Sequence, residues 1–258
     1  MKKANTVPLE RAISKLGLHS RKVARELILA GKVQVDGRLV KDPDYKVVPE
    51  KIKLIIDEVE AKKVATLYLI LHKPKGLVTT SQDEKGRKTI YSCLEDIKQH
   101  LPAVGRLDMM TSGLLILTND NRFSAWLTDP LNAIPRNYIV AVRGEVTEEE
   151  IHKMIMGIKD QGETLKANNV VLLKSSGKES LLNVELCEGK NREIRRLMLA
   201  FKHEVTALKR ISFGRLELGQ LEIGQWRELS KTELEKSFPD YPFQFLNDIT
   251  SKTIDSGR

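Results

Sequence analysis

The spacing of apolar and polar residues divides the chain into short helices and strands. Near the N-terminus, residues 9–16 have the spacing of a helix, and Ser20 is a suitable cap for a second helix over 21–30. The stretch KVQVDGRLV then predicts two strands joined by a tight turn at Asp36 and Gly37. This part therefore has the pattern of a small helix-and-hairpin unit.

From residue 67 onward, apolar strands alternate with few helices and many loops. We expect Thr147 and Glu150 to form a capping box and Asn191 to cap a later helix. Strands are expected at LYLILHK, GLLILTND, NYIVAVRG, LLNVELCEG and VTALKRISFG, and helices at 121–127, 147–156 and 192–201. The pattern predicts an α+β fold with a mixed, largely antiparallel sheet rather than a doubly wound one.

The polar, aperiodic stretch EVEAKKVAT separates the two patterns. We predict a small N-terminal α/β domain at 8–57, a linker at 58–66 and a larger domain at 67–230. Residues 231–258 are expected to form a short helix followed by a poorly ordered tail.

Positive charge is concentrated in the first unit. The whole chain has 258 residues, 41% of them hydrophobic, and a net charge of +8. Residues 1–50 hold eleven Lys and Arg against six Asp and Glu. Arg21, Lys22 and Arg25 lie on the second predicted helix, where they fit either a solvated face or contacts with RNA phosphates. We favour RNA, because the positive charges crowd onto this helix and its flanks.

Other bulk features argue against several classes of protein. The two cysteines, Cys93 and Cys187, are far apart in sequence, which favours a cytoplasmic protein without disulfides. The five histidines show no metal-ligand spacing. The N-terminus lacks the pattern of a secretory signal, and no apolar run reaches the ~20 residues of a membrane span.

Three stretches of the second unit carry polar groups that a core would not require. They are VGRLDMMTSGLLILTND, with Arg106 and Asp108; RNYIVAVRG, with Tyr138; and EGKNREIRRL, with Arg192, Arg195 and Arg196 at helical spacing. Asp108 also fits a turn cap, Tyr138 an ordinary strand position and the arginines a solvated helix face. Spacing alone does not show that the three stretches meet.

The first unit resembles a known RNA-binding module. Its helix start at Ser20 and Arg21, the stretch LILAGKVQVDG and the following hairpin are similar to the RNA-binding domain of small-subunit ribosomal protein S-four. The resemblance covers residues 9–47 and implies docking on structured RNA without any chemistry.

The second unit resembles the pseudouridine synthases that modify ribosomal RNA, in the branch that carries an S-four-like domain. The segment GRLDMMTSGLLILTND matches the family's most specific motif. The other motifs follow in the family's order: KPKG with TTSQDEKGRKTI, then RNYIVAVRG, EGKNREIRRL and LKRISFGRLELGQLEIGQWREL. Together they span most of residues 67–229.

The resemblance implies a role for each matching residue. Asp108 matches the catalytic nucleophile, Arg195 the arginine paired with it, and Tyr138 the tyrosine that packs on the target base. Arg106 matches the residue that replaces the flipped uridine in the RNA stack. Other residues expected to bind substrate are Lys73, Arg192, Arg196, Leu208 and Lys209. Glu193 departs from the family, which often has Gln there.

The implied reaction isomerises a uridine of ribosomal RNA to pseudouridine and requires no cofactor and no metal. We expect base flipping, a dry pocket around Asp108, a looped or single-stranded substrate element, and a monomeric enzyme. Large-subunit 23S RNA is favoured over small-subunit 16S RNA. Two alternatives stay open: a non-catalytic RNA-binding assembly factor, and a metal-dependent nuclease that uses Asp83, Asp108 and Asp120.

Overall fold

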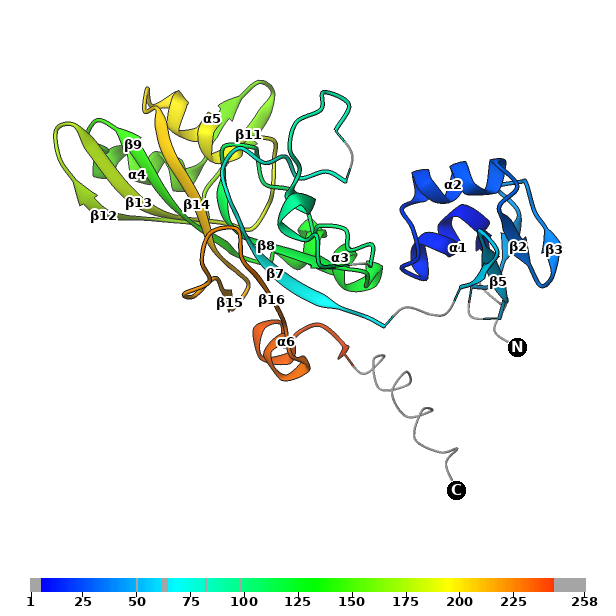
Figure 1. Ribbon diagram of the computed structural model, residues 1–258. Helices are drawn as coiled ribbons and strands as arrows, with labels where there is room; N and C mark the ends of the chain where they lie inside the picture. Colours follow the sequence, from blue (N-terminus) through cyan, green and yellow to red (C-terminus); the bar gives the residue numbers. More distant parts are fainter. Residues whose placement is uncertain (1–5, 50, 62–64, 82, 98, 244–258) are drawn as a thin grey trace.

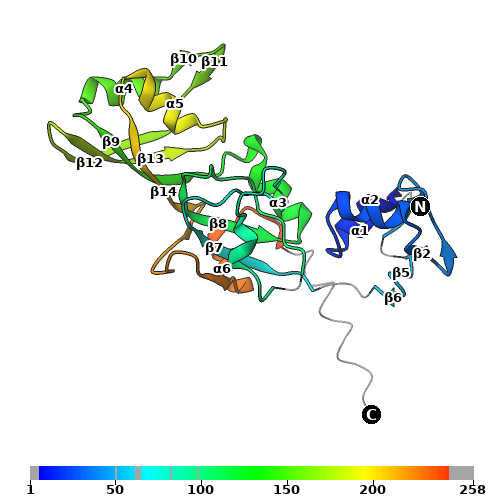
Figure 2. The same cartoon turned by 45° about the horizontal axis from the view of Figure 1, so that its top comes forward.

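The chain forms two units of different size (Figure 1). The computed structural model describes residues 6–49, 51–61, 65–81, 83–97 and 99–243. A small N-terminal unit lies beyond helix α3 at one end of a larger unit that is built around a long sheet, as two views show (Figures 1 and 2). Among the described residues, none of the helices is both long and apolar enough to cross a membrane.

Two helices pack against small sheets in the N-terminal unit. Its elements are β1 (Val7–Pro8), α1 (Leu9–Lys15), α2 (Arg21–Leu29), β2 (Val33–Val35), β3 (Arg38–Leu39), β4 (Lys46–Val47), β5 (Leu54–Ile56) and β6 (Val59–Glu60). Ser20 caps α2 as predicted, because its Oγ accepts from the amide of Val23 at 3.2 Å. Asp36 and Gly37 have φ values of 51° and 80°, as the predicted tight turn requires.

This unit has its own hydrophobic core. Apolar faces of α1 and α2 meet strands β2 and β5, and the buried residues include Leu9, Ile13 and Ile28. Strand β6 pairs with β5, so residues 59 and 60 belong to this unit and not to the linker predicted at 58–66. Three positions of that linker, 62–64, lie outside the described residues.

A mixed sheet dominates the C-terminal unit, which confirms the predicted α+β fold. Its strand order is β12-β13-β9-β14-β8-β7-β16, with β15 beside β14. The strands are β7 (Tyr68–Lys73), β8 (Ser112–Thr118), β9 (Arg136–Arg143), β12 (Asn169–Ser175), β13 (Glu179–Leu186), β14 (Val205–Phe213), β15 (Leu216–Glu217) and β16 (Trp226–Glu228). The pairing of β14 with β8 is parallel, and the other pairs are antiparallel.

Helices and a small hairpin cover the sheet. They are α3 (Asn121–Thr128), α4 (Glu148–Met156), α5 (Glu193–Ala200), α6 (Lys231–Ser237), the 3-10 turns η1 (Ile90–Cys93) and η2 (Pro130–Asn132), and the hairpin β10 (Ile158–Asp160) and β11 (Glu163–Leu165). The capping box of Thr147 and Glu150 forms as predicted. The predicted tail beyond residue 243 lies outside the described residues.

Two apolar cores fix the strands that carry the site. One core lies between the sheet and α4 and α5, and the other packs α3 and α6 against the opposite part of the sheet. Strands β7 and β8 are buried along their whole length, because both of their faces are covered. The central strands therefore give a rigid support to the loops at their ends.

Gly113 allows β8 and β14 to approach each other closely. A Cβ atom built at Gly113 would lie 2.1 Å from the carbonyl oxygen of Arg210, far inside any tolerable contact. The φ of Gly113 is also positive, at 109°. The Thr-Ser-Gly segment therefore joins the loop of Asp108 to the strand that carries Leu208 and Arg210.

Candidate active site

Asp108 lies on a tight loop directly before β8. The amide of Thr111 donates to the carbonyl of Asp108 at 2.9 Å, which closes the turn. On the other side, the Leu107 side chain is buried in the core, and the Thr79 hydroxyl donates to the Leu107 carbonyl at 2.8 Å. The loop is thus fixed before and after the carboxylate, as a catalytic group requires.

A buried lysine holds this loop from beneath. Lys73 ends β7 with 0% of its surface exposed, and its Nζ donates to the carbonyls of Asp108, Met109 and Thr111 at 3.3, 3.4 and 2.9 Å. Burial lowers the pKa of Lys73 to about 8, although the charge of Asp108 favours its cationic form. Its ammonium group is enclosed by backbone carbonyls, so this geometry gives Lys73 a supporting role and lends no support to the prediction that it binds substrate.

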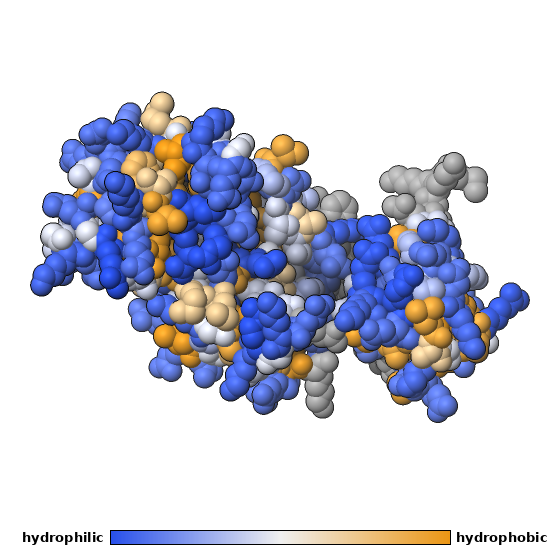
Figure 3. Space-filling view, turned by 90° about the horizontal axis from the view of Figure 1, so that it is seen from above, coloured by the Kyte–Doolittle hydropathy of each residue, from blue (hydrophilic) through white to orange (hydrophobic). Residues whose placement is uncertain are grey.

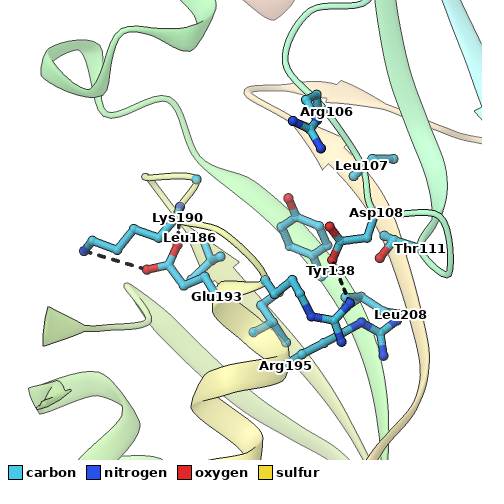
Figure 4. Close-up of a pocket in the computed structure, with 13 residues that line it drawn as sticks. Arg106, Leu107, Asp108, Thr111, Tyr138, Leu186, Lys190, Glu193, Arg195 and Leu208 are labelled. Atoms are coloured by element: carbon cyan, nitrogen blue, oxygen red, sulfur yellow. Dashed lines mark hydrogen bonds and ion pairs between the residues drawn. The ribbon is translucent and has the colours of Figure 1, made fainter. Parts of the chain in front are cut away.

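The side chain of Asp108 faces a cavity of about 100 Å³. Tyr138 lies beside it in Figure 4, on the neighbouring part of β9, and only 9% of Tyr138 is exposed. Leu186 and Leu208 complete an apolar wall of this cavity. Leu208, which we expect to bind substrate, thus lines the same cavity as Asp108 and Tyr138.

Arginines from the α5 region surround the carboxylate. Nη1 of Arg192 lies 4.0 Å from Oδ2 of Asp108. Arg195 instead donates to the carbonyls of Met110 and Val205, at 3.1 and 3.3 Å. Burial and the charge of Arg192 lower the pKa of Arg195, and the nearby charge of Asp108 acts in the opposite direction. Arg195, which we expected to pair with Asp108, bonds to backbone carbonyls instead. The ion pair with Asp108 comes from Arg192, at 4.0 Å.

The N-terminus of α5 differs from the one that the sequence predicted. Arg192 precedes the helix with a φ of 48°, in the left-handed region, and no side chain caps the helix. The prediction of Asn191 as the cap is therefore wrong.

The side chain of Asp108 is 32% exposed, so its surroundings are wetter than the dry pocket we expected.

Arg196 stabilises the fold instead of facing the cavity. Its Nε donates to Asp160 at 2.6 Å and its Nη1 to Glu163 at 2.8 Å. These bonds attach the hairpin β10–β11 to α5. The charge of Arg196 is neutralised by two carboxylates of this hairpin, so the structure lends no support to the prediction that it binds substrate.

Glu193 forms a buried acidic pair next to the cavity. It is 3% exposed, and it accepts from the amide of Lys190 at 3.1 Å. Burial, and then a hydrogen bond and charge from Glu188, raise the pKa of Glu193 to about 7. The Lys190 ammonium group bonds to Glu188. The contacts of Glu193 and Lys190 therefore hold the loop that leads to Arg192.

Arg106 and Lys209, which we also expect to bind substrate, lie in different places relative to the cavity. Arg106 is exposed at the mouth of the cavity, above Asp108 in Figure 4. Lys209 is half-buried on β14 and does not line the cavity of Asp108. Strand alternation explains the difference, because Lys209 points to the opposite face of β14 from Leu208.

The basic residues of α2 are partly neutralised. Arg21 and Arg25 donate to the carboxylate of Glu10 at 2.9 and 3.0 Å, but more than half of each side chain is exposed. Lys22 is exposed on the same helix. All three residues remain accessible to a partner, although Glu10 offsets part of their charge.

Arg136 and Arg210 were not among the predicted site residues. Arg136 lies two positions before Tyr138 on β9, so strand alternation places both on one face. The two-residue repeat of a strand is therefore the signal in the sequence that could have identified Arg136. Arg210 pairs with Tyr138 across β9 and β14, and both arginines line a second cavity beside Asp108.

The carboxylates of the nuclease hypothesis do not converge. Asp120 caps α3 and accepts from the hydroxyl of Tyr68 at 2.8 Å. Asp83 is bonded to Arg87 in the loop that precedes η1. Within the described ranges, no cluster of three or more His, Cys, Asp or Glu residues is arranged to hold a metal ion. The nuclease hypothesis therefore has no arrangement of ligands to support it.

Comparisons with known proteins agree with this geometry. The family model for RNA pseudouridylate synthases matches residues 67–200, and the S4 domain model matches residues 7–52. An uncharacterized RNA pseudouridine synthase of Aquifex aeolicus (strain VF5) is 36% identical over 90% of this chain and 94% of its own. Ribosomal large subunit pseudouridine synthase B of Bacillus subtilis (strain 168) is 35% identical over 88% of this chain and 94% of its own.

A solved structure supports the same assignment over nearly the whole chain. The crystal structure of a pseudouridylate synthase has a TM-score of 0.62 and 26% identity, and the match covers 89% of this chain and 99% of that one. The chain therefore belongs to the RNA pseudouridylate synthase family, whose members are isomerases acting on RNA, and it carries an S4 domain ahead of the catalytic unit.

Proposed function

We propose that the protein converts a uridine of ribosomal RNA to pseudouridine, with Asp108 as the nucleophile. The observation that carries this proposal is the position of Asp108. Its carboxylate lies on a loop held by the buried Lys73, beside Tyr138 and within 4.0 Å of Arg192. A carboxylate held rigidly beside an aromatic ring and a guanidinium group suits nucleophilic catalysis.

The proposed reaction conserves all atoms and electrons. The bond between uracil nitrogen-1 and ribose carbon-1′ breaks, and a bond between carbon-5 and carbon-1′ forms. Carbon-5 loses its proton, and nitrogen-1 gains one. Asp108 forms a transient covalent bond to the substrate, and the hydroxyl of Tyr138 is the group best situated to assist proton removal, because it lines the same cavity.

The target base has to leave its stack to reach Asp108. Flipping a base costs a few kcal/mol, which contacts to the flipped base and the RNA backbone offset. We assign base stacking to Tyr138 and filling of the vacated position to Arg106, which is exposed at the cavity mouth. A looped or single-stranded uridine is the favoured substrate, because it is the least costly to extrude.

The N-terminal unit supplies docking in this proposal. We assign 8–60 to it and 67–230 to the catalytic unit, and we propose that both act within one chain in the cytoplasm. Large-subunit 23S RNA is the favoured substrate, since the relative from Bacillus subtilis is named for the large subunit. Small-subunit 16S RNA is the second candidate.

Mapping of pseudouridines in both rRNAs tests the substrate. We expect one or a few pseudouridines of 23S RNA to disappear in cells that lack the protein and to return when the wild-type gene is restored. Restoring the Asp108→Asn variant is expected to leave them absent. Loss of a 16S pseudouridine would move the assignment to the small subunit, and an unchanged map would support the non-catalytic assembly factor.

A further inference from the structure

A second cavity lies on the other side of Asp108 and Tyr138. Its volume is about 430 Å³, and it shares Arg106, Asp108 and Tyr138 with the first cavity. Arg136 and Arg210 form part of its wall. The roles proposed for the target uridine use the first cavity. They assign no function to the second cavity or to Arg136 and Arg210.

Strand register brings the two arginines together. Arg136 pairs with Phe213 across β9 and β14, and Arg210 pairs with Tyr138. The register shifts between Arg210 and Ser212, which places residues 210 and 213 on the same side of β14. Both guanidinium groups consequently lie over the ring of Phe213, at 4.7 and 5.1 Å from its centre.

Both arginines are buried without an ion pair to a carboxylate, although the charge of Glu193 acts on Arg136 from nearby. Arg136 is 8% exposed and Arg210 is 3% exposed. Arg136 donates to the carbonyl of Leu127 at 3.1 Å, and Arg210 donates through Nε to the carbonyl of Leu114 at 2.7 Å. Across the described parts of the chain, no carboxylate forms an ion pair with either arginine, and Nη2 of Arg210 is buried with no hydrogen-bond partner.

This arrangement is unfavourable unless an anion is bound. Burying a cation costs several kcal/mol when no opposite charge compensates, and two neighbouring cations also repel each other. Other arginines of the same unit are neutralised: Arg196 by Asp160 and Glu163, and Arg227 by Glu233. The face of Phe213 offsets part of the cost, but it supplies no hydrogen-bond acceptor for Nη2 of Arg210.

We propose that Arg136 and Arg210 bind a backbone phosphate of the RNA strand next to the target uridine. Planar guanidinium groups match the oxygens of a phosphate and bind it through paired hydrogen bonds. Because the two cavities share Asp108 and Tyr138, a base in the first cavity leads its own backbone into the second. The proposal rests on the proposed function, since it takes the uridine in the first cavity as given.

Figure 3 shows the hydropathy of one face of the molecule. Hydrophilic side chains cover most of the face shown, and hydrophobic ones form only small patches between them. A polar surface of this kind suits a nucleic acid rather than an apolar protein partner. Phosphate binding at buried arginines would then fix the strand, while exposed basic residues add weaker attraction.

The main experiment replaces single phosphates of the RNA by neutral methylphosphonates. The probe is an rRNA fragment that contains the mapped uridine, and binding is measured with full-length protein carrying Asp108→Asn, which separates affinity from turnover. We expect one replacement next to the target uridine to weaken binding about tenfold, as loss of a charged hydrogen-bonded contact predicts. The Arg136→Gln substitution is expected to weaken binding by a similar factor.

The decisive observation is the combination of the two changes. With Arg136→Gln, the same methylphosphonate is expected to have a clearly smaller effect than in the parent protein, because only Arg210 still contacts that phosphate. Arg143→Gln is the matched control: Arg143 also lies on β9, but it is exposed and paired with Glu204. Independent, multiplying losses from Arg136→Gln and from every methylphosphonate would overturn the proposal.

Folding and the proposed function are checked separately. Arg136→Lys keeps the positive charge but cannot make the paired hydrogen bonds of a guanidinium group. We expect it to melt like the wild type and to bind RNA with intermediate affinity.

If no uridine is modified, titration with inorganic phosphate at constant ionic strength still tests the anion site. Saturable binding that Arg136→Gln abolishes and Arg143→Gln retains supports an anion site, and its absence refutes one. Phosphate binding without methylphosphonate coupling would rule out the RNA assignment.

Discussion

At the scale of single residues, the site depends on charges that are held in place by the backbone. Lys73 is enclosed by carbonyls of the loop that carries Asp108 and is bonded to three of them. Arg195 likewise bonds to the carbonyls of Met110 and Val205. Both cations therefore hold the loop of Asp108 in place, and Arg195 also lines the cavity together with Arg192 and Tyr138.

Replacing Lys73 by Met tests this positioning role. The substitution keeps the length and apolar stem of the side chain but removes the donor to three carbonyls of the loop. Unmet hydrogen bonds in a buried position cost about 1–3 kcal/mol each. We expect kcat for pseudouridine formation to fall at least about tenfold with little change in RNA affinity. A large loss of affinity with unchanged kcat would instead support direct substrate binding by Lys73.

Glu193 gives a prediction for the dependence of stability on pH. Its pKa is raised in the folded state, so the folded protein binds more protons than the unfolded chain between about pH 4.5 and 7. The contribution of Glu193 to stability is therefore largest in acid and is lost as pH rises through about 7. Glu193→Gln is expected to match the wild type near pH 5 and to exceed its free energy of unfolding by about 2 kcal/mol near pH 8.5.

Denaturant unfolding of both proteins at these two pH values measures the effect. The neighbouring charges are those of Glu188, Lys190 and Arg136, and none of them is altered by the substitution. An equal difference in stability at both pH values would show that Glu193 does not titrate in this range.

Sequence alone identified some of these residues but not their settings. Asp108 and Tyr138 were found because motif and resemblance agree there. The burial of Lys73 follows from the path of the 108–111 turn, and the contact from Arg192 follows from its left-handed backbone. Neither feature has a periodic pattern that a sequence could reveal.

At the scale of elements, the site depends on the parallel contact between β8 and β14. The two strands join far-apart segments, with Ser112 opposite Lys209 and Gly113 opposite Arg210. Strands with clear alternation, such as β9 and β13, were predicted from the sequence. The short hairpin β10–β11 was not predicted, because its few residues are mostly polar and its attachment depends on Arg196.

Gly113→Ala tests the close approach of these strands. Because the added Cβ would lie 2.1 Å from the carbonyl oxygen of Arg210, the strands have to separate. We expect a loss of at least about 3 kcal/mol in the free energy of unfolding, together with loss of activity. Gly162→Ala is the control, because Gly162 has a φ of 82° but a Cβ atom added there would meet no heavy atom within 4 Å. Similar losses for both variants would attribute the effect to backbone strain alone.

At the scale of the whole molecule, the proposed function assigns docking to the N-terminal unit and chemistry to the C-terminal unit. The N-terminal unit has a separate core, and Arg21, Lys22 and Arg25 are exposed on α2. The sequence predicted this division because composition and periodicity both change between the units. It did not predict β6, since the polar residues 58–60 have no strand pattern.

Removing residues 1–61 tests the docking role. We expect the affinity for rRNA to fall about tenfold or more, while the rate at saturating RNA changes little, because the catalytic residues all lie beyond residue 66. The affinity of the full chain is expected to fall steeply between about 50 and 200 mM salt, and the truncated chain is expected to show a weaker dependence. Equal affinities or equal salt dependences would exclude phosphate contacts by this unit.

The central claim is that the carboxylate of Asp108 performs the chemistry. The most direct test compares pseudouridine formation by the wild type and by Asp108→Asn on the mapped rRNA fragment, with RNA binding measured in parallel. We predict that Asp108→Asn binds the fragment as tightly as the wild type within a few-fold but forms no detectable pseudouridine. Turnover by Asp108→Asn close to the wild-type rate would contradict the account.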